Sequence, residues 1–469
     1  MNLRLITLAV AFACVWVGFS DETEALQRRI DAASAAGGGR VVVAAGDHPI
    51  TSIFLKSNVT LELERGARLY DAPTNRDDYL DAVLGVKGDC RVRKWRDCAT
   101  AVICGNGATN VAVVGEGTVD GCGSRLFDLS QSPGRYRNVV LYRCRGIRLE
   151  GVSLVNSARW TCYLKECEDV TIRRVKVRSL GCWNNDGIDL EARRVLIEDC
   201  DVEADDDAIC LKAFNPDFVC EDVEVRNCRL ASNCDHFKIG TETYGGVRNV
   251  RVRNCEFVPC STNVITQVKN RSGSNRGIPG WNPNEIVSRC GLALECVDGG
   301  FLENVRISGV RMNRSCQTPI FIRLGARHPN AAGRESHLRD VVIEDVTGEA
   351  ASQIARSITG VPGLRPRDVT IRNVDLKLMG GVTAEAASRP VPEAVKSYPE
   401  NRMFGRHPLP AFGFYVRHVD GMTFENVRLR LGTSDARRPV VRDDVTDIVF
   451  RNCDFPSAEN SGTGPVNSL

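Results

Sequence analysis

A short β-strand pattern that returns along almost the whole chain is the feature that most constrains its fold. Each copy alternates apolar and polar residues, passes through Asn or Asp, continues with Cys or Val, and alternates again, as in Val223-Glu224-Val225-Arg226-Asn227-Cys228. Alternation with a period of two residues predicts strands rather than helices. The copies begin at Val59, Val111, Ile147, Val170, Val195, Val223, Val250, Val305, Val341, Val369, Met422 and Ile448.

The spacing of these copies predicts a solenoid. From Ile147 to Val250, successive copies begin 23 to 28 residues apart, which is a period typical of stacked repeats. Three short strands for each rung account for this length, so we predict an all-β, right-handed parallel β-helix. Blades of a propeller need about 40 residues, and a leucine-rich solenoid needs recurring Leu and a helical turn. These two folds are the alternatives.

Two gaps in the series are close to double the period. They run from Val250 to Val305 and from Val369 to Met422. We interpret the segment Val264-Ile265-Thr266-Gln267-Val268 as a further rung inside the first gap.

Asn and Cys recur at the turn of the repeat. Cys follows Asn or Asp at Cys200, Cys228, Cys255 and Cys453. A thiol that returns in register indicates buried packing more than a disulfide framework, although one or two disulfides remain possible because we also predict export. Asn at stacked turns can pass its side-chain amide to the next rung.

The first residues read as a signal peptide followed by a cap. Arg4 precedes an apolar stretch from Leu5 to Phe19, which is too short for a comfortable membrane span. We therefore predict a signal peptide over residues 1–20, a secreted or periplasmic protein, and one catalytic domain over residues 21–469; a short buried helix is the alternative. Residues 22–36 predict an amphipathic helix that caps the solenoid before Gly37-Gly38-Gly39.

Charge excludes some partners. The chain carries 61 basic and 59 acidic residues, for a net charge of +2. This balance argues against nucleic-acid and membrane-surface partners, and an acidic sugar polymer would have to be held by local cations. We expect a monomer, since stacked rungs hide their strand edges. Excursions over residues 73–99, 269–289 and 383–410 can wall a groove.

Two acidic segments lie about one repeat apart. Asp186 lies in one of them, and the run Asp205-Asp206-Asp207 lies in the next. Matched positions on neighbouring rungs are about 4.8 Å apart. Carboxylates at such distances shift one another's pKa values, which suits acid–base cleavage of a polysaccharide. For Asp206 and Asp207 to face the same substrate, the strand must bulge or end at this point.

These segments resemble glycoside hydrolase family 28, the polygalacturonase-like pectin hydrolases. The residues that carry the resemblance are Asn184-Asn185-Asp186-Gly187-Ile188-Asp189, Asp206-Asp207-Ala208-Ile209-Cys210-Leu211-Lys212 and Phe237-Lys238-Ile239-Gly240-Thr241, with similar segments near residues 34–43 and 54–59. The resemblance implies hydrolysis of α-linked galacturonan or related pectic chains, with inversion and without a metal or other cofactor. It also implies that Asp206 is the general acid, and that Asp186 and Asp207 hold and deprotonate the attacking water.

The chain departs from the family pattern at two places. Asp235 and His236 stand where the family has Gly-His-Gly, and Gln267 with Lys269 stands where it has Arg-Ile-Lys. A lysine does not reproduce a bidentate arginine clamp on a uronate, so a rhamnogalacturonan-type or other polymer is as suitable a substrate as galacturonan. We predict substrate contacts from Trp183, Asn184, Asp235, His236, Glu242, Tyr244, Gln267 and Lys269. A structural role is the alternative for His236.

Two other functions stay open. One is a Ca²⁺-dependent polysaccharide lyase on the same scaffold, in which acidic side chains bind the ion. The other is a carbohydrate-binding or adhesin-like β-helix without catalysis. An unsaturated, ultraviolet-absorbing product would identify the lyase, and the absence of any sugar turnover would identify the binding protein.

Overall fold

The architecture comes from a computed structural model of the chain. It describes residues 22–71, 101–123, 136–263, 280, 282, 284–328, 333, 335–405 and 407–456. The chain divides into two compact units, residues 1–206 (unit 1) and 207–469 (unit 2). A single domain over residues 21–469 stays a prediction.

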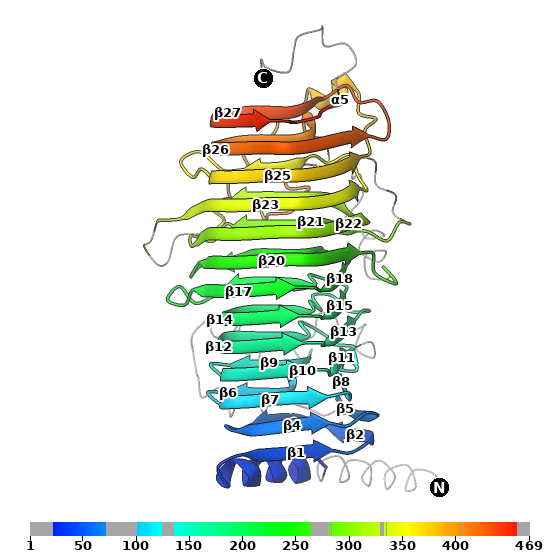
Figure 1. The fold of residues 1–469 in the computed structure, drawn as a ribbon, viewed down its shortest axis with the longest axis vertical. Coiled ribbons are helices and arrows are strands. Elements are labelled where there is room, and N and C mark those ends of the chain that lie inside the picture. The colour runs from blue at the N-terminus through cyan, green and yellow to red at the C-terminus, as the bar shows by residue number, and fades with distance from the viewer. Residues whose placement is uncertain are drawn as a thin grey trace, which may run out of the picture. The chain divides into compact units, whose positions relative to one another are not determined.

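Unit 1 is a coil of parallel strands (Figure 1). Three strands make each rung, and rungs stack into three sheets: β1-β4-β7-β10-β12-β14 (sheet A), β2-β5-β8-β11-β13-β15 (sheet B) and β3-β6-β9-β12-β14 (sheet C). The strands are β1 Gly39–Val43, β2 Gly46–Ile50, β3 Ile53–Leu55, β4 Val59–Leu63, β5 Ala67–Asp71, β6 Ala101–Asn106, β7 Thr109–Gly115, β8 Thr118–Asp120, β9 Arg137–Tyr142, β10 Arg145–Glu150, β11 Ser153–Val155, β12 Cys162–Arg173, β13 Lys176–Ser179, β14 Ile188–Glu198 and β15 Asp201–Ala204.

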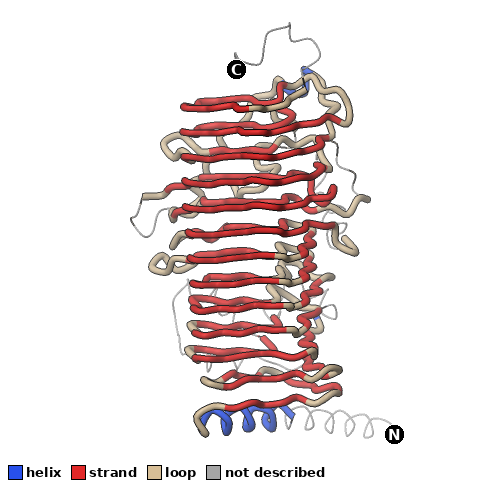
Figure 2. The backbone as a smooth tube through the Cα atoms, in the orientation of Figure 1, coloured by secondary structure: helices blue, strands red, loops and turns tan. Residues whose placement is uncertain are grey.

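Unit 2 repeats this construction with longer strands that run from one sheet into the next. Sheet A is formed by β17-β20-β22-β23-β25-β26-β27, and sheet C by β16-β19-β21-β22-β24-β26, while β18 pairs with β20. The elements are β16 Ile209–Ala213, β17 Cys220–Arg226, β18 Arg229–Ser232, β19 Asp235–Thr243, β20 Val247–Val258, β21 Ser288–Cys296, β22 Phe301–Leu324, β23 His337–Ala350, β24 Arg356–Thr359, β25 Arg367–Leu378, α5 Ala384–Ala387, β26 Ala411–Leu431 and β27 Arg438–Arg451. Figure 2 shows the strands in red. The predicted right-handed parallel β-helix is confirmed.

The predicted repeat is confirmed residue by residue. In unit 1, Val111 pairs with Ile147, and Ile147 pairs with Val170. In unit 2 the pairing is continuous, and each rung start pairs with the next in the series Val223, Val250, Val305, Val341, Val369, Met422 and Ile448. Alternation therefore places these side chains inside the coil, where all of those from unit 2 but Ile448 are buried.

The further rung predicted in the first long gap is wrong. Residues 264–268 themselves lie outside the described residues. Val250 pairs directly with Val305, however, so no rung can lie between them on sheet A.

The turns explain why Asn or Asp precedes Cys or Val. Asn373 has a φ of +52°, a left-handed conformation that Asn and Asp tolerate better than most residues. Its amide nitrogen donates to Asp345 Oδ1 at 2.9 Å, and its Oδ1 accepts from the Asn426 amide at 2.9 Å. The residue that follows such a turn points inward: Cys255, which follows Asn254 (φ +55°), is buried, and its thiol donates to the Arg253 carbonyl at 3.4 Å. The predicted amide ladder and buried thiols are confirmed at these turns.

The predicted capping helix is also confirmed, over residues 22–35 (Figure 2). Leu26 and Ile30 are buried. Gln27 pairs with the backbone of Phe54, donating to its carbonyl at 3.0 Å and accepting from its amide at 2.7 Å. The helix thus covers apolar surface and satisfies backbone groups that the first rung would otherwise expose. The predicted signal peptide, residues 1–20, lies outside the described residues.

In unit 2, the segment after β25 lies on the outer surface of sheet C. Arg323 of β22 is buried and donates to the carbonyls of Glu393 and Ala394 at 2.9 and 3.1 Å. Met403 packs against Ala293 of β21 and Phe321 of β22. Part of this outer surface is therefore shielded from water, as expected for one of the predicted groove-walling excursions. Among the described residues, no helix has the length and apolar character needed to cross a membrane.

Candidate active site

In unit 1, the two acidic turns meet on neighbouring rungs, as predicted. Strands β13 and β15 are parallel neighbours, with Ser179 opposite Ala204. Beyond this pair, the Gly181 amide donates to Asp205 Oδ2, and the Asn184 side chain donates to Asp206 Oδ2 at 3.4 Å. The turn that carries Asp186 therefore lies beside the turn that carries Asp205 and Asp206.

The three acids of unit 1 differ in accessibility. Asp186 and Asp205 are buried, whereas Asp206 is only partly buried. Because Asp205 accepts a backbone amide, it fixes the turn. Strand β15 ends at Ala204 and β16 begins at Ile209. Strict alternation therefore does not apply at Asp206 and Asp207. The strand ends before these residues, which is one of the two arrangements that would let both face the same substrate.

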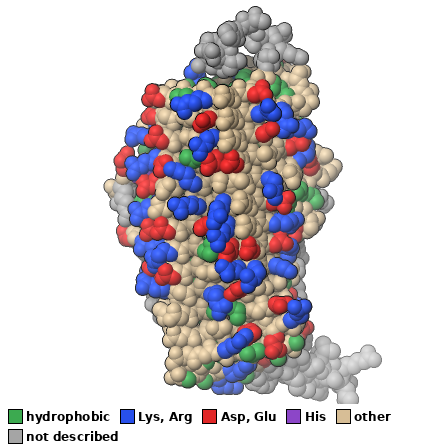
Figure 3. Space-filling view, in the orientation of Figure 1, with side chains coloured by type: hydrophobic (Ala, Val, Ile, Leu, Met, Phe, Trp, Pro, Cys, Tyr) green, Lys and Arg blue, Asp and Glu red, His purple; other side chains and the backbone are tan. Residues whose placement is uncertain are grey.

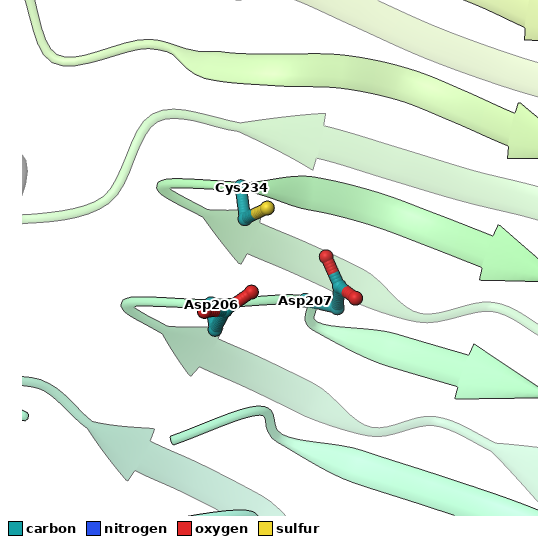
Figure 4. Close-up of side chains that lie close together, drawn as sticks. All are labelled: Asp206, Asp207 and Cys234. Carbon is teal, nitrogen blue, oxygen red and sulfur yellow. The ribbon is translucent and has the colours of Figure 1, made fainter. Parts of the chain in front are cut away.

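In unit 2, Asp207 lies at the start of a buried ionic group. Asp207 precedes β16, and Cys234 precedes β19, which is the neighbouring strand on the next rung. Figure 4 shows both side chains. Asp207 Oδ2 lies 3.2 Å from Lys238 Nζ. The same ammonium lies 3.0 Å from Asp235 Oδ2 and 3.8 Å from Glu295 Oε2. Lys238 of β19 thus joins three carboxyl groups from three successive rungs.

Burial makes this group electrostatically strong. Asp207, Asp235, Lys238 and Glu295 are each at most 4% exposed. Burial disfavours the charged form of Lys238, but Asp207 and Glu295 raise its pKa well above the ordinary value. Burial also raises the pKa of Glu295 well above its ordinary range, and the nearby Lys238 offsets this only in part.

A second ionic group lies along the same sheet. Lys212 Nζ of β16 lies 3.2 Å from Glu242 Oε2, and Arg327 Nη2 lies 3.8 Å from Glu242 Oε1. Arg327 also makes two hydrogen bonds to the buried Asp298, at 2.7 and 2.8 Å. Although burial by itself would raise the pKa of Glu242, Lys212 and Arg327 hold it below the ordinary value. Glu242 is therefore an ion-pair partner of two cations.

Aromatic rings lie near both groups. The Tyr398 ring centroid is 6.0 Å from Lys238 Nζ and 5.2 Å from Arg327 Cζ, and the residue is 49% exposed. Tyr244 stacks on His328 with a centroid distance of 5.9 Å. In unit 1, Trp183 is half-buried. An accessible ring of this kind offers a flat face to a sugar.

His236 occupies a structural position. It has no exposed surface, and its ring stacks on Phe257 at 4.9 Å. Its Nε2 lies 3.0 Å from the Val258 carbonyl, and its Nδ1 lies 3.1 Å from Ser288 Oγ. Burial lowers the pKa of His236 to about 4. This placement fits the structural alternative and does not fit a substrate contact, because Phe257, Val258 and Ser288 enclose the ring and leave it no exposed surface.

Several residues of this region were missed by sequence reasoning, and two predicted ones are not described. Gln267 and Lys269 lie outside the described residues. Glu295, Asp298, Arg327 and Tyr398 were missed because they come from distant rungs and from the segment over sheet C. One available signal was the single charge in the apolar run Leu292-Ala293-Leu294-Glu295-Cys296, since a charge in a buried strand needs a partner.

Comparison with known proteins places the chain among carbohydrate-active proteins. Residues 75–278 match the family described as "Glycosyl hydrolases family 28". The alpha-L-rhamnosidase rgxB of Aspergillus niger is 23% identical over 385 residues, covering 78% of this chain and 84% of the relative.

Solved structures share the fold. The family 28 exopolygalacturonase of Yersinia enterocolitica superposes with a TM-score of 0.61 at 15% identity, covering 94% of this chain and 76% of that chain. The hyperthermoactive exopolygalacturonase of Thermotoga maritima superposes with a TM-score of 0.55 at 21% identity, covering 76% and 83%.

Proposed function

We propose that the chain is a glycoside hydrolase of the family whose model matches residues 75–278, and that it cleaves α-glycosidic bonds of a pectin-like polysaccharide with inversion. One observation carries the proposal. The acidic turns of this family segment lie on neighbouring rungs, with Asp206 the accessible acid and Asn184 in contact with it.

The proposed reaction uses three aspartates. Asp206 donates its proton to the glycosidic oxygen as the bond from the anomeric carbon to that oxygen breaks. A water held by Asp186 and Asp207 attacks the anomeric carbon from the opposite side and gives up a proton to this pair. The ion pair between Asp207 and Lys238 supports the assignment, because a base must be ionised before it can accept a proton.

The charges of unit 2 support a substrate that is not a pure polyuronate. Among the described residues of unit 2, the cations Lys212, Lys238 and Arg327 each lie within ion-pair distance of carboxyl groups. A uronate bound there must compete with these acids. A neutral sugar avoids this competition and can rest on Tyr398. We therefore propose a rhamnogalacturonan-type substrate in preference to polygalacturonate, consistent with Gln267 at the position of the family's arginine.

We also propose that the protein is exported from the cell. A polymer of this kind is met outside the cell, and residues 1–20 have the pattern of a signal peptide.

A panel of pectic fragments tests the function. We expect new reducing ends from rhamnogalacturonan fragments, fewer from polygalacturonate, and the inverted anomer as first product in NMR spectra. The variant Asp206→Asn should lower kcat by about 10²- to 10⁴-fold. The matched control is Asp217→Asn, the same exchange at an exposed loop residue, which should leave kcat unchanged.

Three outcomes would overturn the proposal. Retention of configuration would contradict the assignment of the base. An ultraviolet-absorbing unsaturated product that disappears with chelator would identify a lyase. No turnover of any fragment by the wild-type chain would leave a carbohydrate-binding protein.

A further inference from the structure

We propose that Lys238 is a positioning residue that holds the Asp207 carboxylate in place and ionised for its role as base. The inference rests on the proposed function, which assigns Asp207 to the attacking water. It concerns a residue that the family resemblance leaves without a role, on the rung where Asp235 replaces the expected histidine.

The geometry comes from strand alternation. In β19, Phe237 and Ile239 point into the coil and are fully buried there, so Lys238 projects from the outer surface of sheet C. Asp207 precedes the neighbouring strand β16, and Glu295 belongs to β21 on the other side. The ammonium therefore lies between two rungs and binds an acid from each.

The Lys238 ammonium is held by contacts with two aspartates. Its Nζ lies 3.2 Å from Asp207 and 3.0 Å from Asp235, whose other oxygen accepts the Cys290 amide at 3.1 Å. Asp235 is thus anchored to backbone and holds Lys238, and Lys238 in turn holds Asp207. A buried lysine tied at two points loses most of its rotamer freedom, so its charge stays at one place.

Charge balance distinguishes the three carboxyl groups around Lys238. Three buried carboxyl groups share one ammonium, so they cannot all ionise without an uncompensated buried charge. Other titratable or charged groups near this cluster include Asp206, Cys234, Cys290, Tyr398, Glu400 and Arg289. Burial raises the pKa of Glu295 well above its ordinary range, and its carboxyl group lies farther from the ammonium, at 3.8 Å, than those of Asp207 and Asp235, at 3.2 and 3.0 Å. Lys238 consequently keeps a strong interaction with Asp207.

The inference predicts the direction of two pH shifts. For an enzyme whose base must be ionised, kcat rises with pH through the pKa of the base. Replacing Lys238 by Met removes a cation near Asp207, so the acidic limb of the kcat profile should move to higher pH, by about 1 to 3 units. Replacing Asp235 by Asn removes a neighbouring negative charge but keeps a side-chain oxygen that can accept from Lys238, so the ammonium stays in place and the acidic limb should move to lower pH.

The experiment compares Lys238→Met, Asp235→Asn and Lys212→Met with the wild-type chain on the fragment that is cleaved fastest. Lys212→Met is the matched control: it removes an equally buried lysine from the same sheet, but one that pairs with Glu242. Its acidic limb should stay in place, whatever happens to KM. Circular dichroism and thermal unfolding establish that each variant is folded.

The outcomes separate this inference from the proposed function. Opposite shifts in Lys238→Met and Asp235→Asn, with none in Lys212→Met, support it. An active wild-type chain whose acidic limb does not move in Lys238→Met contradicts the role of Lys238 and leaves the hydrolase assignment standing. If Lys238→Met does not fold, Asp235→Asn decides alone, since an unchanged or raised limb contradicts the inference. A wild-type chain without hydrolase activity overturns both.

Discussion

Two outer surfaces of unit 2 carry ion pairs, and they differ in how much water reaches them. On the exposed side of the long strands, basic and acidic side chains are interspersed (Figure 3). Arg430 of β26 and Asp375 of β25 are 57% and 34% exposed there and 2.7 Å apart. Beside sheet C, just beyond the ends of β22 and β21, Arg327 and Asp298 form an equally short pair, but Asp298 is fully buried. Both surfaces arise from the same alternating strands.

The comparison shows that burial, more than the number of ion pairs, decides which pairs affect the stability of the fold. An exposed pair contributes little because water and salt screen it and because two long side chains must be ordered. In a buried pair, removal of one partner leaves an uncompensated charge. The segment over residues 383–405 covers part of sheet C: Met403 packs against Ala293 and Phe321, and the Tyr398 ring centroid lies 5.2 Å from Arg327 Cζ.

The largest effect should follow from breaking the buried pair. Asp298→Ala leaves Arg327 without its bidentate partner and the Thr243 amide without an acceptor that lies 3.3 Å away. We expect the free energy of unfolding to fall by about 3 to 5 kcal/mol. Urea denaturation measures it, with Asp375→Ala as the exposed control. Equal losses in the two variants would remove the distinction between the surfaces.

An intermediate effect should follow at the turn ladder, which is exposed but hydrogen-bonded. Asn373→Ala removes the amide contacts to Asp345 and Asn426 and places Ala at a φ of +52°. The expected loss is about 1 to 2 kcal/mol. Asn373→Gly, which relieves the backbone strain but not the lost contacts, separates the two contributions. A loss below that of the exposed ion pair would contradict the ladder's contribution.

The smallest effect should come from the exposed pair itself. A double-mutant cycle on Arg430→Ala and Asp375→Ala should give a coupling energy of about 0.2 to 1 kcal/mol, which falls as salt is added. Thermal unfolding at low and high ionic strength measures it. A coupling that persists in high salt would show that this surface is less exposed to solvent than its side chains indicate.

Much of the fold could be predicted because it depends on neighbours in sequence. Val305, Val341 and Val369 were identified as rung starts and pair with one another. The register follows from a period of two, which permits only one side of each strand to face inward. The rung predicted at residues 264–268 was wrong because a short apolar run shows only that a strand is possible there. It does not show which strands pair, and Val250 pairs directly with Val305.

The candidate site was predictable only in part. Asp206 and Asp207 were found because they lie in one local motif, and the contact between Asn184 and Asp206 agrees with the predicted pairing of turns in unit 1. The partners of Asp207 were not found. Lys238 is 31 residues further along the chain and Glu295 is 88 residues further, as their numbers show, and only stacking brings them together.

The amino-acid sequence by itself determined the coil: its rungs, the turns that need Asn or Asp, the buried thiols and the helix that covers the first rung. These are consequences of side-chain alternation and backbone preference, which act over a few residues. Only the tertiary structure decided which charges are buried and paired, because that depends on rungs and excursions far apart in the chain. Lys238, placed between Asp207 and Glu295 and shielded from water, is the clearest example.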